Sequence, residues 1–282
     1  MLNRQSETFF ECSASFEQAD YVLFGAPYDS TTSFRPGARF GSAHMRAESF
    51  GLETYSPYQD KDIADLNIFD AGELPLPMGA PESTLGIIEA AVSGILADGK
   101  LPLMLGGEHL VSLGAMRAAA KAYPDLHILH FDAHADLRDE YLGQKLSHAS
   151  VIRRVWDVIG DGRIHQFGIR SGDRSEFTWA KEHVSFHPFG FDNLEHSLNA
   201  LNGKPVYFTL DLDVLDPSEC PGTGTPEAGG VSFLTLLDAI IKVGRLNIIG
   251  CDIVELCPVY DQSGASTSLA CKVLRELLLS LS

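Results

Sequence analysis

The sequence is poor in cysteine and in basic residues, and it has no long apolar run. Its five cysteines include no Cys-x-x-Cys pair and no spacing typical of a small disulfide scaffold, which predicts reduced, packed thiols in a cytoplasmic protein. Nowhere do eighteen apolar residues follow one another, and residues 1–7 show no apolar core after a basic start. These absences predict that the chain neither spans a membrane nor carries an export signal.

Basic side chains are too few and too scattered for a nucleic-acid-binding surface. The chain has 21 Lys and Arg against 38 Asp and Glu, a formal net charge of −17, and it has no Lys/Arg-rich block. Such an acidic protein repels polyanions, so we expect neither nucleic acid nor an anionic membrane as a partner. The same acidity suits a small cationic substrate.

Short apolar runs alternate with segments of helical period along almost the whole chain, which is typical of βαβ units in a parallel sheet covered by helices. No linker interrupts this pattern, so the sequence predicts one domain, residues 1–282. We expect strands at 21–26, 64–69, 101–105, 126–132, 164–168, 184–186, 206–212 and 247–253, and helices at 81–98, 109–122, 232–243 and 263–281. An open doubly wound sheet and a closed (β/α)₈ barrel both fit, and both put catalytic groups at the carboxyl ends of the strands.

Two Asp-rich runs lie where expected strands end, and they supply five side chains of metal-ligand type: Asp132, His134, Asp136, Asp211 and Asp213. On an extended chain, residues two apart point to the same side, so these side chains can converge. Four ionised carboxylates could hardly coexist in one partly buried cleft without cations. The two runs therefore predict a site for two divalent metal ions.

A sixth candidate ligand is His109, which follows the turn Gly106-Gly107-Glu108 after the strand expected at 101–105. The glycines permit a sharp turn that can aim the histidine across the strand ends. The complete set has oxygen ligands, two imidazoles and no thiolate. This chemistry favours Mn²⁺, while Mg²⁺, Ni²⁺ and Zn²⁺ remain open.

Further motifs surround these ligands. They are Gly-Ala-Pro-Tyr-Asp at 25–29, Arg-Pro-Gly-Ala-Arg-Phe-Gly at 35–41, Pro-Gly-Thr-Gly-Thr at 221–225 and Val-Glu-Leu-Cys-Pro at 254–258. In type, order and spacing, the whole set resembles the ureohydrolase family, the arginase and agmatinase enzymes, and most closely the bacterial agmatinases. The resemblance implies a three-layer α-β-α fold with an eight-stranded parallel open sheet, not a barrel. It also implies two Mn²⁺ per chain and a homo-oligomer, either a trimer or a hexamer.

The resemblance also distributes the six ligands over two ions. It assigns one ion to His109, Asp132, Asp136 and Asp211, and the other to Asp132, His134, Asp211 and Asp213. Asp132 and Asp211 then bridge the pair. Two ions that share one water make hydroxide available near neutral pH, and this hydroxide attacks the carbon of a guanidinium group.

Three side chains complete the catalytic hypothesis. Asp136 accepts a hydrogen bond from the hydroxide and then takes up its proton. His148 matches the family's proton shuttle and general acid, although alone it would be an ordinary loop histidine. Glu255 ends the strand expected at 247–253, where its two carboxylate oxygens can clamp the planar guanidinium, or merely cap a neighbouring loop.

The seven residues at 137–143 bear on the substrate's far end. They lack the asparagine pattern by which arginases recognise the amino-acid end of arginine, and they resemble agmatinases instead. The resemblance implies agmatine as the substrate, with putrescine and urea as products. Asp139 or Glu140 can attract the ammonium of agmatine, whereas Arg138 can equally recognise a carboxylate. Guanidinobutyrase activity is therefore the first alternative, followed by formiminoglutamate hydrolysis and arginase activity.

Two other classes of protein fit part of the pattern. A dinuclear phosphoesterase also uses carboxylate-bridged metals, but it ordinarily offers basic groups to the phosphoryl oxygens, and these acidic loops offer few. A metal-binding scaffold or regulatory relative without turnover would lack a ligand, the shuttle or the clamp. All these positions are filled here.

Four polar residues near the motifs are expected to support the structure rather than to bind a ligand. His130 should form hydrogen bonds deeper in the sheet, and Glu108 should steady the turn around His109 through backbone bonds. Asp216 should fix the turn of its loop. Asp252 should face away from the site.

Overall fold

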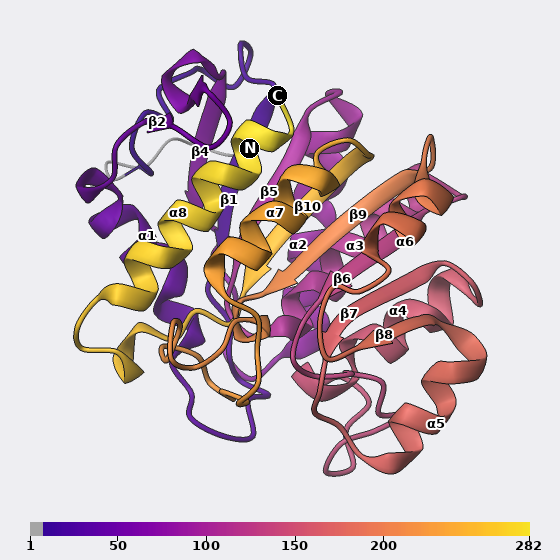
Figure 1. Ribbon diagram of the computed structural model, residues 1–282. Helices are drawn as coiled ribbons and strands as arrows, with labels where there is room; N and C mark the ends of the chain where they lie inside the picture. Colours follow the sequence, from indigo (N-terminus) through magenta and orange to yellow (C-terminus); the bar gives the residue numbers. More distant parts are fainter. Residues whose placement is uncertain (1–7) are drawn as a thin grey trace.

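The computed structural model describes residues 8–282, so residues 1–7, on which the expectation of no export signal partly rests, lie outside the described residues. Eight parallel strands form one sheet in the order β4-β1-β5-β10-β9-β6-β7-β8 (Figure 1). They are β1 (Tyr21–Ala26), β4 (Ile68–Glu73), β5 (Leu101–Gly106), β6 (His127–Phe131), β7 (Ile164–Ile169), β8 (Ser185–Pro188), β9 (Pro205–Asp211) and β10 (Asn247–Val254). Because β4 and β8 lie at opposite edges, the sheet is open, and the barrel is excluded.

Helices cover both faces of the sheet. In Figure 1, α7 and α8 lie in front of the strands, and α2 and α3 lie behind them. The front layer holds α1 (Gly41–Glu48), α6 (Leu194–Leu201), α7 (Phe233–Val243) and α8 (Ala265–Ser280), and the rear layer holds α2 (Pro81–Ala97), α3 (Ser112–Ala122), α4 (Val151–Ile159) and α5 (Arg174–His183). No helix formed by residues 8–282 is long and apolar enough to cross a membrane.

The inner strands β1, β5, β9 and β10 are largely apolar on both faces, which explains why they appear in the sequence as continuous apolar runs. Leu103 and Phe208 pack in the front apolar cluster, whereas their chain neighbours Met104 and Tyr207 pack in the rear one. Successive side chains of a strand point to opposite faces, so a single run supplies both clusters. The core therefore consists of two apolar layers separated by the sheet.

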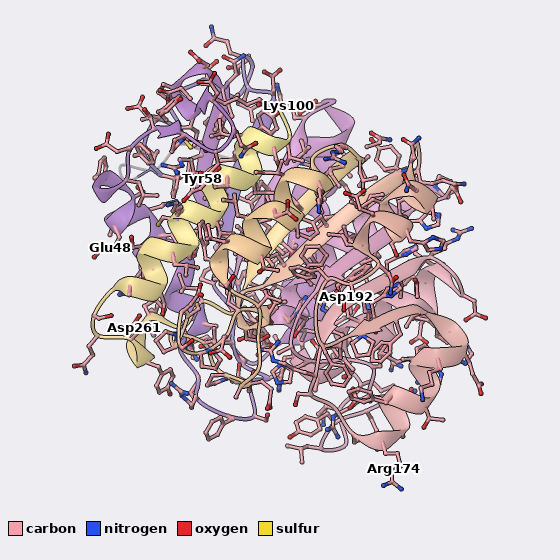
Figure 2. All side chains as sticks on the ribbon, in the orientation of Figure 1. Glu48, Tyr58, Lys100, Arg174, Asp192 and Asp261 are labelled. Atoms are coloured by element: carbon pink, nitrogen blue, oxygen red, sulfur yellow. The ribbon has the colours of Figure 1, made fainter. Side chains whose placement is uncertain are left out.

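Several helices begin at the signals that the sequence offers. Pro81 lies in the first turn of α2, and the Ser232 hydroxyl accepts a hydrogen bond from Thr235 N at the start of α7. Asp261, labelled in Figure 2, lies in the loop before α8, where its carboxylate accepts a hydrogen bond of 2.7 Å from Ser266 N. Such capping satisfies backbone N–H groups that have no partner inside the helix.

The strand expected at 64–69 was placed too early in the chain. Residues Ile63–Asp65 form a 3-10 turn, because the Asp62 carboxylate accepts a hydrogen bond of 3.0 Å from Ala64 N. The strand β4 begins only at Ile68. A local bond between a side chain and the backbone thus competes successfully with strand formation.

Four helices and one hairpin had not been predicted. The helices α1 and α6 have eight residues each, α5 is mostly polar, and α4 begins without a side-chain cap. The hairpin pairs β2 (Tyr55–Ser56) with β3 (Lys61–Asp62). Elements of at most ten residues span few turns, so an apolar period is difficult to recognise in them from the sequence, even in α4, where it is pronounced.

A buried ion cluster joins α1 to the edge strand β4. The Arg46 guanidinium contacts Asp70 through two hydrogen bonds of 2.8 and 2.9 Å and also contacts Glu73. Arg46 is 3% exposed and Asp70 is 1% exposed. Removing the cation would leave a buried carboxylate without compensation, which costs more than the loss of a surface ion pair.

We predict that Arg46→Met lowers the free energy of unfolding by about 3–5 kcal/mol, because Asp70 loses its only described cationic partner. Urea denaturation followed by circular dichroism measures this change. Arg245→Met is the matched control, since Arg245 is exposed and lies 3.6 Å from Glu195, and it should cost less than about 1 kcal/mol. Equal stability of the two variants would contradict the buried ion-cluster role.

Candidate metal centre and active site

The predicted metal ligands lie together at the carboxyl edge of four adjacent strands, β5, β10, β9 and β6. The turn His109–Val111 follows β5, residues 132–136 follow β6, and Asp211 and Asp213 lie at the end of β9. Ligand-binding groups collect at this edge of open α/β sheets because the sheet fixes the roots of the loops. Segments more than a hundred residues apart therefore supply one site.

The first group of side chains surrounds His109. Its Nδ1 atom lies 2.9 Å from Asp132 Oδ2, 3.3 Å from Asp211 Oδ2 and 3.4 Å from Asp136 Oδ2. All four residues are at least nine-tenths buried. Three carboxylate oxygens and one imidazole nitrogen thus face a common point.

The second group surrounds His134. Its Nδ1 atom lies 2.9 Å from Asp213 Oδ2 and 3.5 Å from Asp132 Oδ1. The atoms that Asp132, His134 and Asp213 offer lie close enough to hold one ion. Since Asp132 turns Oδ2 toward His109 and Oδ1 toward His134, this carboxylate stands between the two groups.

The electrostatics of the cluster call for cations. Burial first, and then the charge of Asp132, raise the pKa of Asp136 well above its ordinary value. Burial and the charges of Asp213 and Asp132 do the same to the pKa of Asp211. Burial alone would lower the pKa of His109, but the carboxylates of Asp132 and Asp211 raise it well above its ordinary value. Bound protons thus compensate the negative charge of the carboxylates, and divalent metal ions can replace these protons.

The hydrogen bonds of His109 leave one nitrogen for a cation. Thr209 Oγ1 donates its proton to Asp252 Oδ1 at 2.6 Å, so it accepts from His109 Nε2 at 3.0 Å. His109 Nδ1 is buried, and among residues 8–282 it has no hydrogen-bond partner, although it lies 2.9 Å from Asp132 Oδ2. The donor set and this unpartnered nitrogen fit a divalent metal ion. The Asp252 carboxylate is thus joined to His109 through Thr209, so it supports a candidate ligand rather than facing away from the site as had been expected.

Two of the carboxylates sit on a left-handed backbone. Asp136 has φ 53° and Glu255 has φ 66°. This region favours glycine, and a non-glycine residue held there by surrounding contacts costs about 1–3 kcal/mol, with aspartate tolerating it better than glutamate. Glu255 N donates to Gly107 O at 2.9 Å, and Arg153 N donates to Asp136 O at 3.1 Å. These bonds hold both carboxylates toward the cluster.

A cavity of about 220 Å³ opens above the cluster. Four predicted metal ligands, together with His148 and Glu255, line it. The cavity is also lined by side chains that precede or begin helices of the rear layer, namely Arg138, Tyr141 and Glu176. A small molecule in this cavity can therefore contact both the cluster and these side chains.

His148 is held by the loop that follows β1. Its Nδ1–H donates to Thr31 O at 3.0 Å, because a carbonyl can only accept, and this leaves Nε2 as the acceptor nitrogen, 3.2 Å from Ser33 Oγ. Burial lowers the pKa of His148 to about 4, so the ring is neutral at pH 7. Glu108 accepts hydrogen bonds from Thr31 N and Oγ1 and thereby fixes this loop, rather than the turn around His109 as had been predicted.

The Glu255 carboxylate contacts the protein backbone and also lines the cavity. Oε1 accepts a hydrogen bond of 2.8 Å from His109 N, while the side chain lines the cavity. Burial raises the pKa of Glu255 to about 8, because the ionised form is poorly solvated there. A cation placed in the cavity would stabilise the ionised carboxylate.

Of the charged residues in the loop at 137–143, only Arg138 lines the cavity. The Arg138 guanidinium lies 3.1 Å from Asp173 Oδ2 and 3.4 Å from Glu176 Oε2, and it stacks over the Tyr141 ring at 4.9 Å. Glu176 and Tyr141 also line the cavity and had not been singled out from the sequence. The capping box that Asp173 and Glu176 form at the start of α5 was a signal present in the sequence.

The two acidic residues of this loop point elsewhere. The Asp139 carboxylate accepts a hydrogen bond of 2.8 Å from Arg154, and Glu140 is exposed. Neither lines the cavity. Their roles at the substrate's tail stay predictions, and the geometry favours Glu176 in their place.

Asp216 braces a loop, as expected. Its carboxylate accepts hydrogen bonds from Ser218 N, Gly229 N and Gly230 N at 2.9–3.1 Å. These bonds lower the pKa of Asp216, with the Ser218 side chain as the largest cause. Although it belongs to the same Asp-rich run as Asp211, this carboxylate is already committed to the backbone.

Comparison with known proteins decides the family. The model of the arginase family matches residues 19–280. The chain belongs to the arginase family. Agmatinase of Bacillus anthracis is 50% identical over 278 residues, covering 97% of this chain and 96% of the relative, and guanidinobutyrase of Pseudomonas aeruginosa is 34% identical, covering 94% and 87%. The structure of agmatine ureohydrolase of Thermoplasma volcanium shares 34% identity and superimposes with a TM-score of 0.90, covering 98% of this chain and 94% of that one.

These findings confirm the predicted ureohydrolase membership and the arginase-like fold. The arginase family consists of metal-dependent hydrolases, and the carboxylate and imidazole cluster lies where such an enzyme needs its metal. The assignment of individual ligands to two ions stays a prediction.

We predict that Asp132→Ala weakens Mn²⁺ binding by more than about 100-fold, because both groups of ligands lose a shared carboxylate. Loss of a residue that only hydrogen-bonds to a ligand typically weakens binding by less than this. Calorimetric titration and metal analysis after loading measure the affinity and the number of ions. Asp216→Ala is the control, since its carboxylate braces a loop, and it should keep both ions. Retention of two ions by Asp132→Ala would exclude the bridging role.

Proposed function

We propose that the chain is an agmatinase, a binuclear manganese hydrolase that converts agmatine and water into putrescine and urea. The observation that carries the proposal is one cavity lined by four of the six metal-ligand side chains together with Glu255 and His148, in a chain 50% identical to an agmatinase. Assembly as a trimer or hexamer and a cytoplasmic location follow from the family resemblance and the composition, and they remain expectations.

The cluster has the donors that two ions need. We assign His109, Asp132, Asp136 and Asp211 to one ion and Asp132, His134, Asp211 and Asp213 to the other. When bound, the two Mn²⁺ supply an activated water as nucleophile near neutral pH. Asp136, held by its left-handed backbone, would accept a hydrogen bond and then a proton from the attacking water.

Glu255 orients the guanidinium group. A planar guanidinium donates two parallel hydrogen bonds to a carboxylate, and Glu255 presents its carboxylate to the cavity while His109 N fixes Oε1. The cationic substrate offsets the burial that raises the pKa of Glu255 to about 8. The guanidinium carbon of the substrate is thereby held next to the metal-ligand cluster, and this orientation lowers the entropy cost of the reaction.

His148 transfers the proton that the leaving amine needs. Its Nε2 atom would take a proton from water in the cavity and pass it to the amine nitrogen, since Nδ1–H is committed to Thr31 O and Nε2 faces Ser33 and the cavity. A pKa of about 4 keeps the ring neutral at pH 7, so it relays a proton rather than storing one. Protonation lets the amine depart as the C–N bond breaks.

The cavity favours an ammonium over a carboxylate at Glu176. Arg138 is shared between Asp173, which does not line the cavity, and Glu176, so its positive charge is already paired. The burial of Glu176 raises its pKa, which an incoming cation would offset. Guanidinobutyrate is the second candidate, because Arg138 lines the cavity and a guanidinobutyrase is among the relatives.

We expect urea release from agmatine to exceed that from guanidinobutyrate, guanidinopropionate and arginine by at least about tenfold in kcat/KM, a difference of about 1.4 kcal/mol. The physical reason is that Arg138 is already paired with two carboxylates, whereas Glu176 in the cavity can pair with an ammonium. Steady-state urea assays with the Mn²⁺-loaded enzyme measure the preference. A higher kcat/KM for a carboxylated guanidine would overturn the agmatinase assignment.

His148→Asn should lower kcat by about 100-fold, since positioned acid–base groups contribute about 10²–10⁴-fold. The metal content should not change, because His148 belongs to neither ligand group. His196→Asn, at an exposed histidine, is the control and should keep full activity. Unchanged kcat of the His148 variant between neutral and alkaline pH would refute the proton-transfer role.

A further inference from the structure

A second fully buried histidine touches the cluster without an assigned role. His130 lies on β6, and its ring centroid is 5.1 Å from that of His109. His130 Nε2 lies 2.8 Å from Asp132 Oδ2. By residue type and distance, His130, His109 and Asp132 could together hold a metal ion. The position of its single ring proton decides whether His130 is a ligand or a hydrogen-bond donor.

Gln166 on β7 lies opposite His130 on β6, and it determines which ring nitrogen of His130 carries the proton. Its Nε2 atom lies 2.7 Å from Ala135 O and 3.0 Å from His130 Nδ1. A carbonyl oxygen only accepts, so the amide atom facing Ala135 is the NH₂ group. The second hydrogen of the same NH₂ group then points to His130 Nδ1.

The orientation of this amide determines the tautomer. Because His130 Nδ1 accepts from Gln166, the ring proton resides on Nε2, which donates to Asp132 Oδ2. The opposite amide orientation would turn two carbonyl oxygens toward each other and the lone pair of Nε2 toward a carboxylate. Among residues 8–282, Gln166 Oε1 has no hydrogen-bond donor, so it offers no competing reason for the amide's orientation.

We infer that Gln166 and His130 are positioning residues for the metal pair, and that His130 is a donor to Asp132 rather than a metal ligand. His130 occupies one lone-pair direction of Oδ2 and fixes the carboxylate between the two ligand groups. The same NH₂ group holds the carbonyl between His134 and Asp136. One amide therefore orders ligands from both groups. This inference rests on the metal pair of the proposed function and not on the identity of the substrate.

Metal affinity tests the inference. His130→Phe removes the donor but keeps a ring, and Gln166→Met removes both amide hydrogen bonds at similar length. Each should weaken Mn²⁺ binding by about 10–100-fold in calorimetric titrations, as loss of an outer hydrogen-bond partner typically does. His130→Gln, which can still donate to Asp132, should restore the affinity to within about threefold.

The control is His165→Phe. His165 is also buried on β7, but it packs with His127 on the opposite side of the strand from Gln166, so Mn²⁺ affinity should not change. Wild-type affinity in His130→Phe would overturn the inference. A loss in His165→Phe equal to that in His130→Phe would do so too, because the effect would then be general destabilisation.

The tautomer provides a second readout that does not involve turnover. In the full chain labelled with ¹⁵N-histidine and loaded with diamagnetic Mg²⁺, nuclear magnetic resonance should show His130 protonated at Nε2 and bare at Nδ1. Gln166→Met should give a mixture of tautomers. A proton on Nδ1 in the wild type, or a His130 nitrogen shifted by metal coordination, would overturn the inference. Neither readout uses urea, so a failed substrate assignment would leave this result intact.

Discussion

The constraint on which the rest of this structure depends is the burial of four aspartates at one edge of the sheet. Burial and neighbouring charges of like sign raise the pKa of Asp136 and of Asp211, and the cluster is stable only if protons or cations compensate. The surroundings of Asp132 serve this need. Two histidines approach it closely, and a third, His134, lies between it and Asp213.

The open sheet makes this concentration of charge possible. Its four central strands run in parallel, so their loops meet at one edge although they come from distant parts of the chain. Apolar layers on both faces keep the strands rigid. Hydrogen bonds such as that from Glu255 N to Gly107 O then join one loop to the next. The cluster is therefore held by the sheet and by its neighbours together, rather than by any single loop.

The sequence predicted the strands and the convergence of the six ligands, because both depend on local periodicity and on strand ends. It could not predict the partners of Glu108 and Arg138, since Thr31 and Asp173 lie far away in the chain. For the same reason, Glu176 was missed, while Asp139 and Glu140 were given a tail-binding role that the cavity does not support. The start of β4 was misplaced for a local reason, the bond between Asp62 and Ala64.

The left-handed backbone at Asp136 and Glu255 has a consequence for how the chain can evolve. Glycine at either position would relax the backbone and raise stability, but it would delete a carboxylate from the cavity. The fold is thus less stable than it could be at two places beside the cluster. At these two positions, selection for stability favours glycine, whereas selection for activity favours a carboxylate. The sequence has the carboxylate at both.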